Sequence, residues 1–275
     1  MQEQALGWRK AGEEIGFVPT MGALHQGHDH LVERARRENG RVVVSIFVNP
    51  TQFAPSEDFN RYPRPFAADR ARLMALGVDV VFHPALDQIY PAAFKTRVDP
   101  GPLAELLEGK SRPGHFGGVL TVVLKLFQLT LPARAYFGLK DFQQVVLVRQ
   151  LVRDLAIPVR IIAVPTIREP DGLALSSRNV YLDPAQRAAA PRIHRSLQAA
   201  VGRFQAGTTD PAALETMVAA ELAAVPGMVV DYVSVLDETT LSRPLRAQPG
   251  NVLAVAVKLG STRLIDNAVL GAERF

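Results

Sequence analysis

Short apolar segments alternate with helix-length polar segments through the first part of the chain, and this alternation limits the possible fold more than any other feature. Residues 15–20 and 41–50 are apolar and of strand length, and the stretch between them, 28–39, ends at Gly40, a residue type that often terminates a helix. A helix-length segment followed by a strand recurs at 66–83, 118–138 and 142–166. Chains of this kind fold as a parallel sheet with helices on both faces.

The pattern changes after residue 167. Two alanine-rich helical segments, 183–204 and 210–224, precede three strand segments at 229–237, 252–259 and 262–270. Helices followed by consecutive strands predict an α+β domain with an antiparallel sheet. We therefore predict an α/β protein with a Rossmann-like domain over 1–167 and a smaller C-terminal α+β domain over 168–275.

Composition narrows the chemistry and the partners. The chain has no cysteine, which excludes disulfides, thiolate nucleophiles and Cys-based metal sites. Its 31 Lys and Arg residues against 27 Asp and Glu residues give a net charge of +4, and the basic residues are scattered, so we expect no nucleic-acid partner. We also expect a cytoplasmic protein without a membrane partner, because no apolar run reaches the roughly 18 to 20 residues that span a bilayer and no signal peptide is evident.

The sequence PTMGALHQGH, residues 19–28, lies where the first predicted strand ends and the first helix begins. Gly22 and Ala23 are small enough to let the backbone approach a ligand, and a helix N-terminus favours phosphate. His25 and His28, three residues apart, can point toward one site and donate hydrogen bonds to the charge that develops at a phosphate.

Two other interpretations of these histidines remain open. A zinc site would need further ligands, and only His30 lies nearby, on a different helical face and without an HExxH pattern. The histidines could also be incidental polar residues, although a glycine turn at a strand end is an unusual place for them. We favour the phosphate role and treat His30 as a bystander.

Polar residues also follow other predicted strands, where α/β sheets bind their ligands. Asn49 and Gln52 come after the second strand and can hydrogen-bond a hydroxyl or a carboxylate. In the segment 138–141, Gly138 allows close approach, Lys140 offers a cation for phosphate, and Asp141 could bind ribose hydroxyls or simply cap a helix. The residues Ser176, Ser177 and Arg178 would clamp the outer phosphates of a nucleotide.

The HxGH motif at residues 25–28 is similar to that of a nucleotidyltransferase superfamily that includes adenylyltransferases and class I aminoacyl-tRNA synthetases. Four further strings narrow the resemblance: VSIFVNPTQF at 44–53, KSRPGHFGGV at 110–119, YFGLKDFQQ at 136–144 and GLALSSRN at 172–179. Together they resemble the pantothenate synthetase family from about residue 16 to the end of the chain.

This resemblance implies an ATP-dependent ligase that condenses pantoate with beta-alanine through a pantoyl-adenylate and releases AMP and pyrophosphate. It implies ATP and Mg²⁺ as cofactors, with magnesium bound mainly through the phosphates, so we expect no metal ligand from the protein beyond Asp69 as a weak candidate. With this resemblance, the domain over 1–167 would bind nucleotide and substrate and the domain over 168–275 would act as a lid. Hydrophobic strand and helix faces would also suit a homodimer. The residues implied in catalysis are His25, His28, Lys140, Ser176, Ser177 and Arg178. Those implied in nucleotide binding are Met21, Gly22, Ala23, Leu24, His25, Gln26, Gly27, His28, Gly138, Leu139, Lys140, Asp141, Ile167, Leu175, Ser176, Ser177 and Arg178. Those implied in substrate binding are Asn49, Gln52 and Gln144.

The chain departs from the family pattern at Leu139, where a Glu is usual, and at Ala67 and Ala68, where an acidic cluster is usual. The alternative function is a nucleotidyltransferase of the same superfamily that acts on another small acceptor. The neutral pair Gln52 and Gln144 argues against a phosphorylated acceptor, which would favour cations. Arg112 and His115 have no assigned role.

Overall fold

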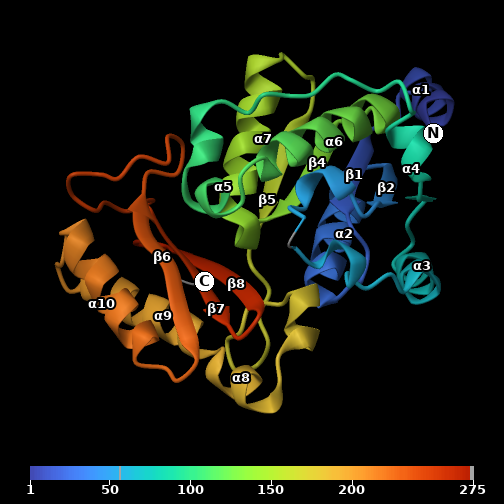
Figure 1. The fold of residues 1–275 in the computed structure, drawn as a ribbon. Helices are drawn as coiled ribbons and strands as arrows, with labels where there is room; N and C mark the ends of the chain where they lie inside the picture. Colours follow the sequence, from blue (N-terminus) through green and yellow to red (C-terminus); the bar gives the residue numbers. More distant parts are fainter. Residues whose placement is uncertain (56, 273–275) are drawn as a thin grey trace. The chain divides into compact units, whose positions relative to one another are not determined.

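The computed structural model describes residues 1–55 and 57–272, and the chain divides into two compact units (Figure 1). The first unit comprises Met1–Leu139 and Gln143–Val164, and the second comprises Lys140–Phe142 and Pro165–Phe275. The predicted domain boundary between residues 167 and 168 and the role of the second domain as a lid remain predictions.

The first unit contains a five-stranded sheet in the order β3-β2-β1-β4-β5, with parallel neighbours throughout. Its strands are β1 (Ile15–Thr20), β2 (Arg41–Ile46), β3 (Val80–Phe82), β4 (Arg134–Gly138) and β5 (Arg160–Val164). Helices join consecutive strands: α2 (Gln26–Glu38), α3 (Phe66–Ala75), α6 (His115–Thr130) and α7 (Phe142–Asp154), with the short α4 (Leu86–Ile89) and α5 (Leu107–Ser111) before α6. The predicted α/β class is confirmed.

Alternating side chains of the strands are buried on opposite faces of this sheet. Phe17 of β1 belongs to a cluster with α6 and α7, whereas its neighbour Val18 packs with Leu31 of α2 and Leu73 of α3. Successive strand residues point to opposite faces, so a strand covered on both sides must be apolar at nearly every position. This is why the strands of the first unit appear in the sequence as continuous apolar runs.

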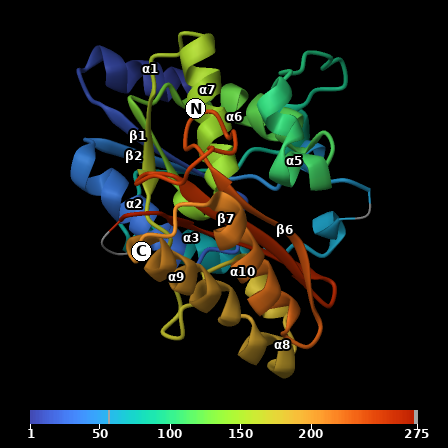
Figure 2. The ribbon, with the colours of Figure 1, turned by 90° about the vertical axis from the view of Figure 1, so that its left-hand side faces the viewer.

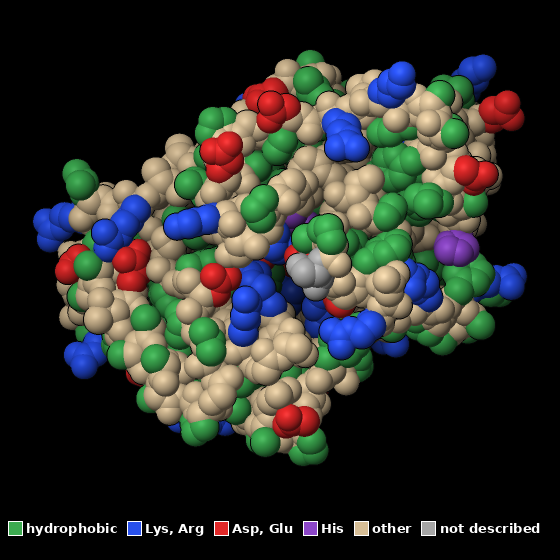
Figure 3. All heavy atoms as spheres, viewed as in Figure 1, with side chains coloured by type: hydrophobic (Ala, Val, Ile, Leu, Met, Phe, Trp, Pro, Cys, Tyr) green, Lys and Arg blue, Asp and Glu red, His purple; other side chains and the backbone are tan. Residues whose placement is uncertain are grey.

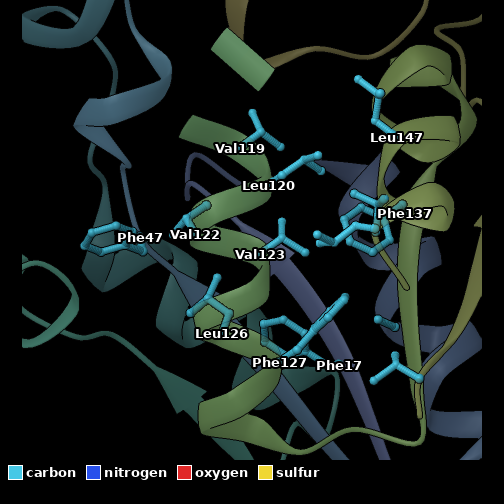
Figure 4. Close-up of a cluster of buried hydrophobic side chains, with 14 of the residues drawn as sticks. Phe17, Phe47, Val119, Leu120, Val122, Val123, Leu126, Phe127, Phe137 and Leu147 are labelled. Carbon is cyan, nitrogen blue, oxygen red and sulfur yellow. The ribbon is translucent and has the colours of Figure 1, made fainter. Parts of the chain in front are cut away.

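Helix α6 provides much of the core on one face of the sheet (Figure 4). Its residues Val119, Val123 and Phe127 are each less than 5% exposed. The Phe127 ring meets the Phe17 ring edge to face, with 6.2 Å between centroids, an arrangement that aromatic pairs favour. At the N-terminus, α1 (Gln2–Lys10) adds Ala5 to the same cluster. No helix was predicted before β1, because α1 is mostly polar and buries only this one residue.

The second unit contains a three-stranded antiparallel sheet in the order β6-β7-β8. Its strands are β6 (Met228–Leu236), β7 (Val252–Leu259) and β8 (Thr262–Val269), and its helices are α8 (Pro184–Ala189), α9 (Arg192–Gln205) and α10 (Pro211–Ala223). Figures 1 and 2 show α9 and α10 side by side along this sheet. The predicted α+β arrangement is confirmed, but the predicted helix over 183–204 is two helices. Helix α8 ends before Pro191, whose ring cannot continue a preceding helix.

The surface carries both signs of charge. Figure 3 shows acidic side chains interspersed among Lys and Arg side chains on the face drawn. Among the described residues, no helix combines the length and the apolarity needed to cross a bilayer. The cytoplasmic location and the homodimer remain predictions.

Helix α6 also packs tightly against the 3₁₀ turn η1 (Pro50–Gln52), and this contact requires glycine at position 118. A Cβ on Gly118 would lie 2.2 Å from the Thr51 carbonyl oxygen and 2.8 Å from the Gln52 nitrogen. Both are backbone atoms, so neither can move without displacing η1. The residues that follow β2 are therefore held against α6.

We expect Gly118→Ala to lower the free energy of unfolding by about 1–3 kcal/mol, as overpacking does. Gly7→Ala is the matched control, because Gly7 lies in α1 of the same unit and its Cβ would meet nothing within 4 Å. The control should be neutral or stabilising by up to about 1 kcal/mol. Urea unfolding of both variants measures the difference, and equal stability of the two would contradict the packing argument.

Candidate functional site

The order of the strands directs attention to the carboxyl ends of β1, β2 and β4. The chain runs from β1 outward to β3 and then returns to place β4 on the other side of β1, so the direction of winding reverses between β1 and β4. Ligands of α/β sheets bind outside the strand ends at such a reversal. The segments that follow these strands, 21–25, 47–52 and 138–139, carry many of the predicted site residues.

The turn after β1 is held by a buried carboxylate. Asp69 of α3 is 3% exposed and accepts hydrogen bonds from the Ala23 N–H and the Leu24 N–H, both at 2.8 Å. Gly22 and Ala23 have φ values of 83° and 52°, in the left-handed region. A carboxylate that accepts from two successive amides stabilises this otherwise strained turn. From the sequence, Asp69 was only a weak candidate for a metal ligand, and its contact with the turn was not predicted.

Helix α3 makes a second contact with the same region. The Arg72 guanidinium donates two hydrogen bonds of 2.6 Å to the Asp29 carboxylate in the first turn of α2, and this pairing raises the pKa of Arg72. A bidentate pair of this kind restricts orientation as well as distance. Helix α3 thus orients both the turn after β1 and the start of α2.

His25 and His28 cap α2 reciprocally. His25 Nδ1 accepts a hydrogen bond from the Gly27 N–H at 3.1 Å, and His28 Nδ1 accepts from the His25 N–H at 3.2 Å. A ring nitrogen that accepts carries no proton, so the proton of each ring in its neutral form lies on Nε2. The two ring centroids are 4.2 Å apart. The cap therefore presents two adjacent imidazoles whose Nε2–H groups are donors, as a phosphate contact requires.

Several amides at this helix start already have protein partners. The Ala23 and Leu24 amides bond to Asp69, the Gly27 amide bonds to His25, and the His28 amide donates to the His25 carbonyl at 2.8 Å. We expected such amides to face a phosphate, and at these four positions the structure differs. The reason is that the Asp69 carboxylate, the His25 ring and the His25 carbonyl accept from these amides.

The remaining residues of the motif lie at the surface or partly buried. Gln26 is exposed, whereas Met21 and Leu24 are half-buried. His30 is exposed, and its Nδ1 lies 3.0 Å from the Gln26 carbonyl on its own helix. His30 thus has a local partner, which agrees with its treatment as a bystander.

Asn49 is 1% exposed and has hydrogen-bond partners within the protein. Its Nδ2 donates to the Gly118 carbonyl and to Gln52 Oε1, both at 3.1 Å, and its Oδ1 accepts from the Tyr90 hydroxyl at 2.9 Å and from the Thr51 hydroxyl at 2.9 Å. This arrangement favours a role in positioning Gln52 over direct contact with a substrate. Direct contact by Asn49 was the prediction from its place at the strand end.

Gln52 is oriented through both its side chain and its backbone. Its Oε1 accepts from Asn49, so its Nε2 is the donor end, and that nitrogen lies 3.1 Å from Met21 Sδ in the turn after β1. Its backbone carbonyl accepts from His115 Nδ1 at 2.7 Å and from Arg112 Nη2 at 3.3 Å. Gln52 therefore offers an N–H group beside the HxGH turn.

Arg112 and His115, which had no assigned role, thus hold the Gln52 segment. Arg112 Nη1 donates to His115 Nε2 at 3.0 Å, which leaves the His115 proton on Nδ1, where it reaches the Gln52 carbonyl. Glu57 accepts from Arg112 at 2.5 and 2.9 Å. Burial opposes ionisation of Glu57, but the Arg112 guanidinium outweighs it and lowers the pKa of this carboxyl.

Neighbouring glutamines of α7 differ in environment. Gln143 is 4% exposed, donates to the Leu103 and Leu106 carbonyls at 2.9 Å, and accepts from the Glu108 N–H at 3.0 Å. Gln144, the predicted substrate residue, is half-buried. Gly138 closes β4, and Leu139 follows it directly. The half-buried position leaves Gln144 available for the predicted contact, whereas the Gln143 amide is used by the fold.

Lys140 and Asp141 come after Leu139 in the chain and belong to the second unit. The Lys140 ammonium lies 3.6 Å from the Asp141 carboxylate, and Asp141 is half-exposed. The Lys140 carbonyl accepts from Asn267 Nδ2 of β8 at 3.2 Å.

A short antiparallel ribbon leads to the predicted phosphate loop of the second unit. Arg168 bridges Ala174, and the Leu175 N–H donates to the Ile167 carbonyl at 2.9 Å. Ser176 then caps the 3₁₀ helix η5 (Ser177–Tyr181), accepting from the Arg178 N–H at 3.3 Å. Backbone pairing within the ribbon therefore determines where the segment that holds Ser176, Ser177 and Arg178 begins.

The arrangement of the acidic and histidine side chains in the described residues can be compared with that of a metal-ligand cluster. Within 1–55 and 57–272, no group of three or more His, Asp or Glu side chains is arranged to hold a metal ion. Both oxygens of Asp69 accept amide hydrogen bonds.

Comparison with known proteins places the chain among ligases. A model of the family described as pantoate-beta-alanine ligase matches residues 1–269. Pantothenate synthetase from Chloroflexus aggregans is 56% identical over 263 residues, which are 95% of this chain and 95% of that protein. The enzyme of the same name from Agrobacterium fabrum is 52% identical over 275 residues, 100% of this chain and 94% of that protein.

Solved structures agree along nearly the whole chain. Pantothenate synthetase from Thermus thermophilus superposes with a TM-score of 0.92 at 49% identity, covering 97% of both chains. Pantoate-beta-alanine ligase from Francisella tularensis, solved in complex with beta-gamma ATP and beta-alanine, superposes with a TM-score of 0.80 at 40% identity, covering 98% of this chain and 96% of that chain.

We expect Asp69→Asn to destabilise the turn after β1, because an amide keeps one acceptor and turns an NH₂ group toward the other backbone N–H. The loss should be about 1–3 kcal/mol in the free energy of unfolding. Asp87→Asn is the control, since Asp87 is an exposed residue of α4 in the same unit. Urea unfolding followed by circular dichroism measures both variants, and a neutral Asp69→Asn would refute the role of the carboxylate.

Proposed function

The chain belongs to the pantoate-beta-alanine ligase family, and we propose that it condenses pantoate with beta-alanine at the expense of ATP, forming pantothenate, AMP and pyrophosphate. The match of the family model to residues 1–269 is the observation that carries this proposal. The family resemblance read from the motifs is confirmed, and with it the enzyme class, an ATP-dependent ligase. The Francisella relative in complex with beta-gamma ATP and beta-alanine supports ATP and beta-alanine as substrates of this chain.

In the first step, a carboxylate oxygen of pantoate attacks the α-phosphorus of ATP, and the bond to the β-phosphate bridging oxygen breaks. The products are pantoyl-adenylate and pyrophosphate. A carboxylate is already ionised at neutral pH, so the protein needs to position the reactants and stabilise the developing charge.

The capped histidines suit this task. Because the two Nδ1 atoms of His25 and His28 accept backbone hydrogen bonds, their Nε2–H groups are the donors that would meet the phosphate oxygens. A fixed pair of neutral donors needs no rearrangement when charge develops at the α-phosphorus. In the second unit, Lys140 and the residues Ser176, Ser177 and Arg178 would stabilise the departing pyrophosphate.

In the second step, the amine of beta-alanine attacks the carbonyl carbon of the adenylate. AMP leaves with the electron pair of the broken C–O bond, and the nitrogen gives up one proton as the amide forms. We propose that Gln52 and Gln144 bind pantoate, with Gln52 presenting its N–H group to a pantoate oxygen. Shielding the adenylate from water keeps it available for the amine.

Magnesium would arrive with ATP and neutralise its phosphates, which is the chemistry it supplies in phosphoryl transfer. Lys140 and Arg178 would share this neutralisation from the protein side. The competing function, transfer of AMP to a phosphorylated acceptor, would favour cations where this chain has the neutral residues Gln52 and Gln144.

The deciding experiment is a pyrophosphate-release assay with MgATP, in which pantoate is added first and beta-alanine second. We expect release that requires pantoate, and stoichiometric pantothenate and AMP, identified by mass, once beta-alanine is present. Formation of ADP, or an adenylylated product that is stable to beta-alanine, would reject the ligase mechanism.

We expect Gln52→Glu to reduce kcat/KM for pantoate by about 100-fold, because the donor nitrogen becomes an anionic oxygen that repels a carboxylate. Gln4→Glu makes the same chemical change at an exposed position of α1 and should leave kcat/KM unchanged. Steady-state kinetics with varied pantoate provides the comparison. Equal values for the two variants would remove Gln52 from the pantoate site.

A further inference from the structure

Two neighbouring residues of β8 contact the two nucleotide-binding segments predicted in the second unit. Strand β8 lies at the edge of its sheet, and successive side chains point to opposite faces. Asp266 lies on the face shared with Leu264 and Ala268, which pack into the helix-covered core, so Asn267 lies on the other face. Both are buried, with exposures of 4% and 7%. A single strand thus reaches two segments from its two faces.

Asp266 holds the ribbon that precedes Ser176. Its carboxylate accepts from Arg168 Nη1 at 2.6 Å and Nη2 at 3.0 Å, and Arg168 Nη1 also donates to the Gly172 carbonyl at 3.2 Å. Gly172 has a φ of 97°, and a Cβ there would lie 2.6 Å from His194 Cδ2 of α9. The Arg168 guanidinium therefore ties the tip of the ribbon to β8 while α9 packs against that tip.

Further contacts of the ribbon fix the position of the predicted phosphate loop, Ser176–Arg178. The Arg168 to Ala174 bridge pairs its two arms, and Asn179 Nδ2 donates to the Ala174 carbonyl at 3.1 Å. Helix η5, which holds Ser177 and Arg178, also contacts β8. The start of the loop is thus determined by contacts that converge on Asp266 and its strand.

Asn267 holds the other segment. Its Nδ2 donates to the Lys140 carbonyl at 3.2 Å, and its own backbone N–H donates to Asp266 Oδ1 at 2.8 Å. The second bond joins the Asp266 carboxylate to the backbone of Asn267. Lys140 is a half-buried residue whose backbone is thereby fastened to β8 while its ammonium extends from that fixed point.

We propose that Asp266 and Asn267 are positioning residues that keep Lys140 and the Ser176–Arg178 loop at a fixed separation on the second unit, so that both engage the phosphates of one ATP. The inference rests on the proposed function, since it takes these residues as phosphate ligands. Neither Asp266 nor Asn267 would touch the nucleotide. Errors of about 1 Å in the placement of charged groups can cost about 100-fold in rate, which gives such anchoring a catalytic consequence.

A buried ion pair is a weak source of net stability, because the desolvation of both charges offsets much of their attraction. The Arg168 and Asp266 side chains are 10% and 3% exposed. We therefore expect the Arg168–Asp266 pair to fix the orientation of the ribbon more than it raises the free energy of unfolding. The same sheet offers a comparison, the Arg263–Asp231 pair between β8 and β6, whose side chains are 19% and 26% exposed.

The test compares Asp266→Asn with Asp231→Asn, which is the same substitution opposite an arginine on the same sheet. We expect Asp266→Asn to lower kcat/KM for ATP by about 10- to 100-fold. The Kd for pantoate, measured by calorimetry without nucleotide, should stay at the wild-type value, because Gln52 and Gln144 belong to the first unit. Asp231→Asn should match wild type in both measurements.

Asn267→Leu keeps the side-chain volume and removes the donor to Lys140, so it tests the second anchor and decides the matter if Asp266→Asn does not fold. It should raise the KM for ATP while the Kd for pantoate is unchanged. Wild-type kcat/KM for ATP in a folded Asp266→Asn or Asn267→Leu variant would overturn the proposal, as would equal losses for ATP and pantoate. If the wild-type protein made no pantothenate, the proposed function would fail, and the Kd for ATP of the same variants would still test the anchors.

Discussion

The carboxylate of Asp69 accepts hydrogen bonds from two successive amides of the turn that follows β1, and the first unit's site is built around that turn. A backbone with positive φ at Gly22 and Ala23 is not favourable by itself, so a buried acceptor from α3 is needed to hold it. Once the turn is held, His25 is placed to cap α2, and the reciprocal bond from His28 follows. The HxGH motif therefore depends on a residue that lies more than forty positions away in the chain.

The reciprocal cap also settles the chemistry of the two histidines. Backbone donors at both Nδ1 atoms place the proton of each neutral ring on Nε2, the tautomer that could donate to a phosphate oxygen. The Gln52 segment is organised in a similar way, with its amide oriented by Asn49 and its carbonyl held by Arg112 and His115. In both places, neighbouring groups determine which atom of the predicted functional side chain is the donor.

Much of the fold could be predicted from the sequence, because strand and helix periodicities are local properties. The apolar runs of β1 and β2, and the three C-terminal strands, were recognised for that reason. Helix α1 was missed because it buries a single residue, Ala5, and the long helix expected over 183–204 was divided at Pro191. The functions of Asp69, Arg112 and His115 could not be predicted, since each acts through a partner distant in sequence.

The sequence by itself determined the α/β and α+β classes, the position of the HxGH motif at a strand end, and the family to which the chain belongs. These depend on residue order and local spacing, which a linear pattern contains. Only the tertiary structure decided that the first amides of α2 are occupied, that Asn49 faces Gln52, and that Asp266 and Asn267 anchor two segments from opposite faces of β8. Hydrogen-bond partners are selected by distance and direction in space, and those quantities exist only once the chain has folded.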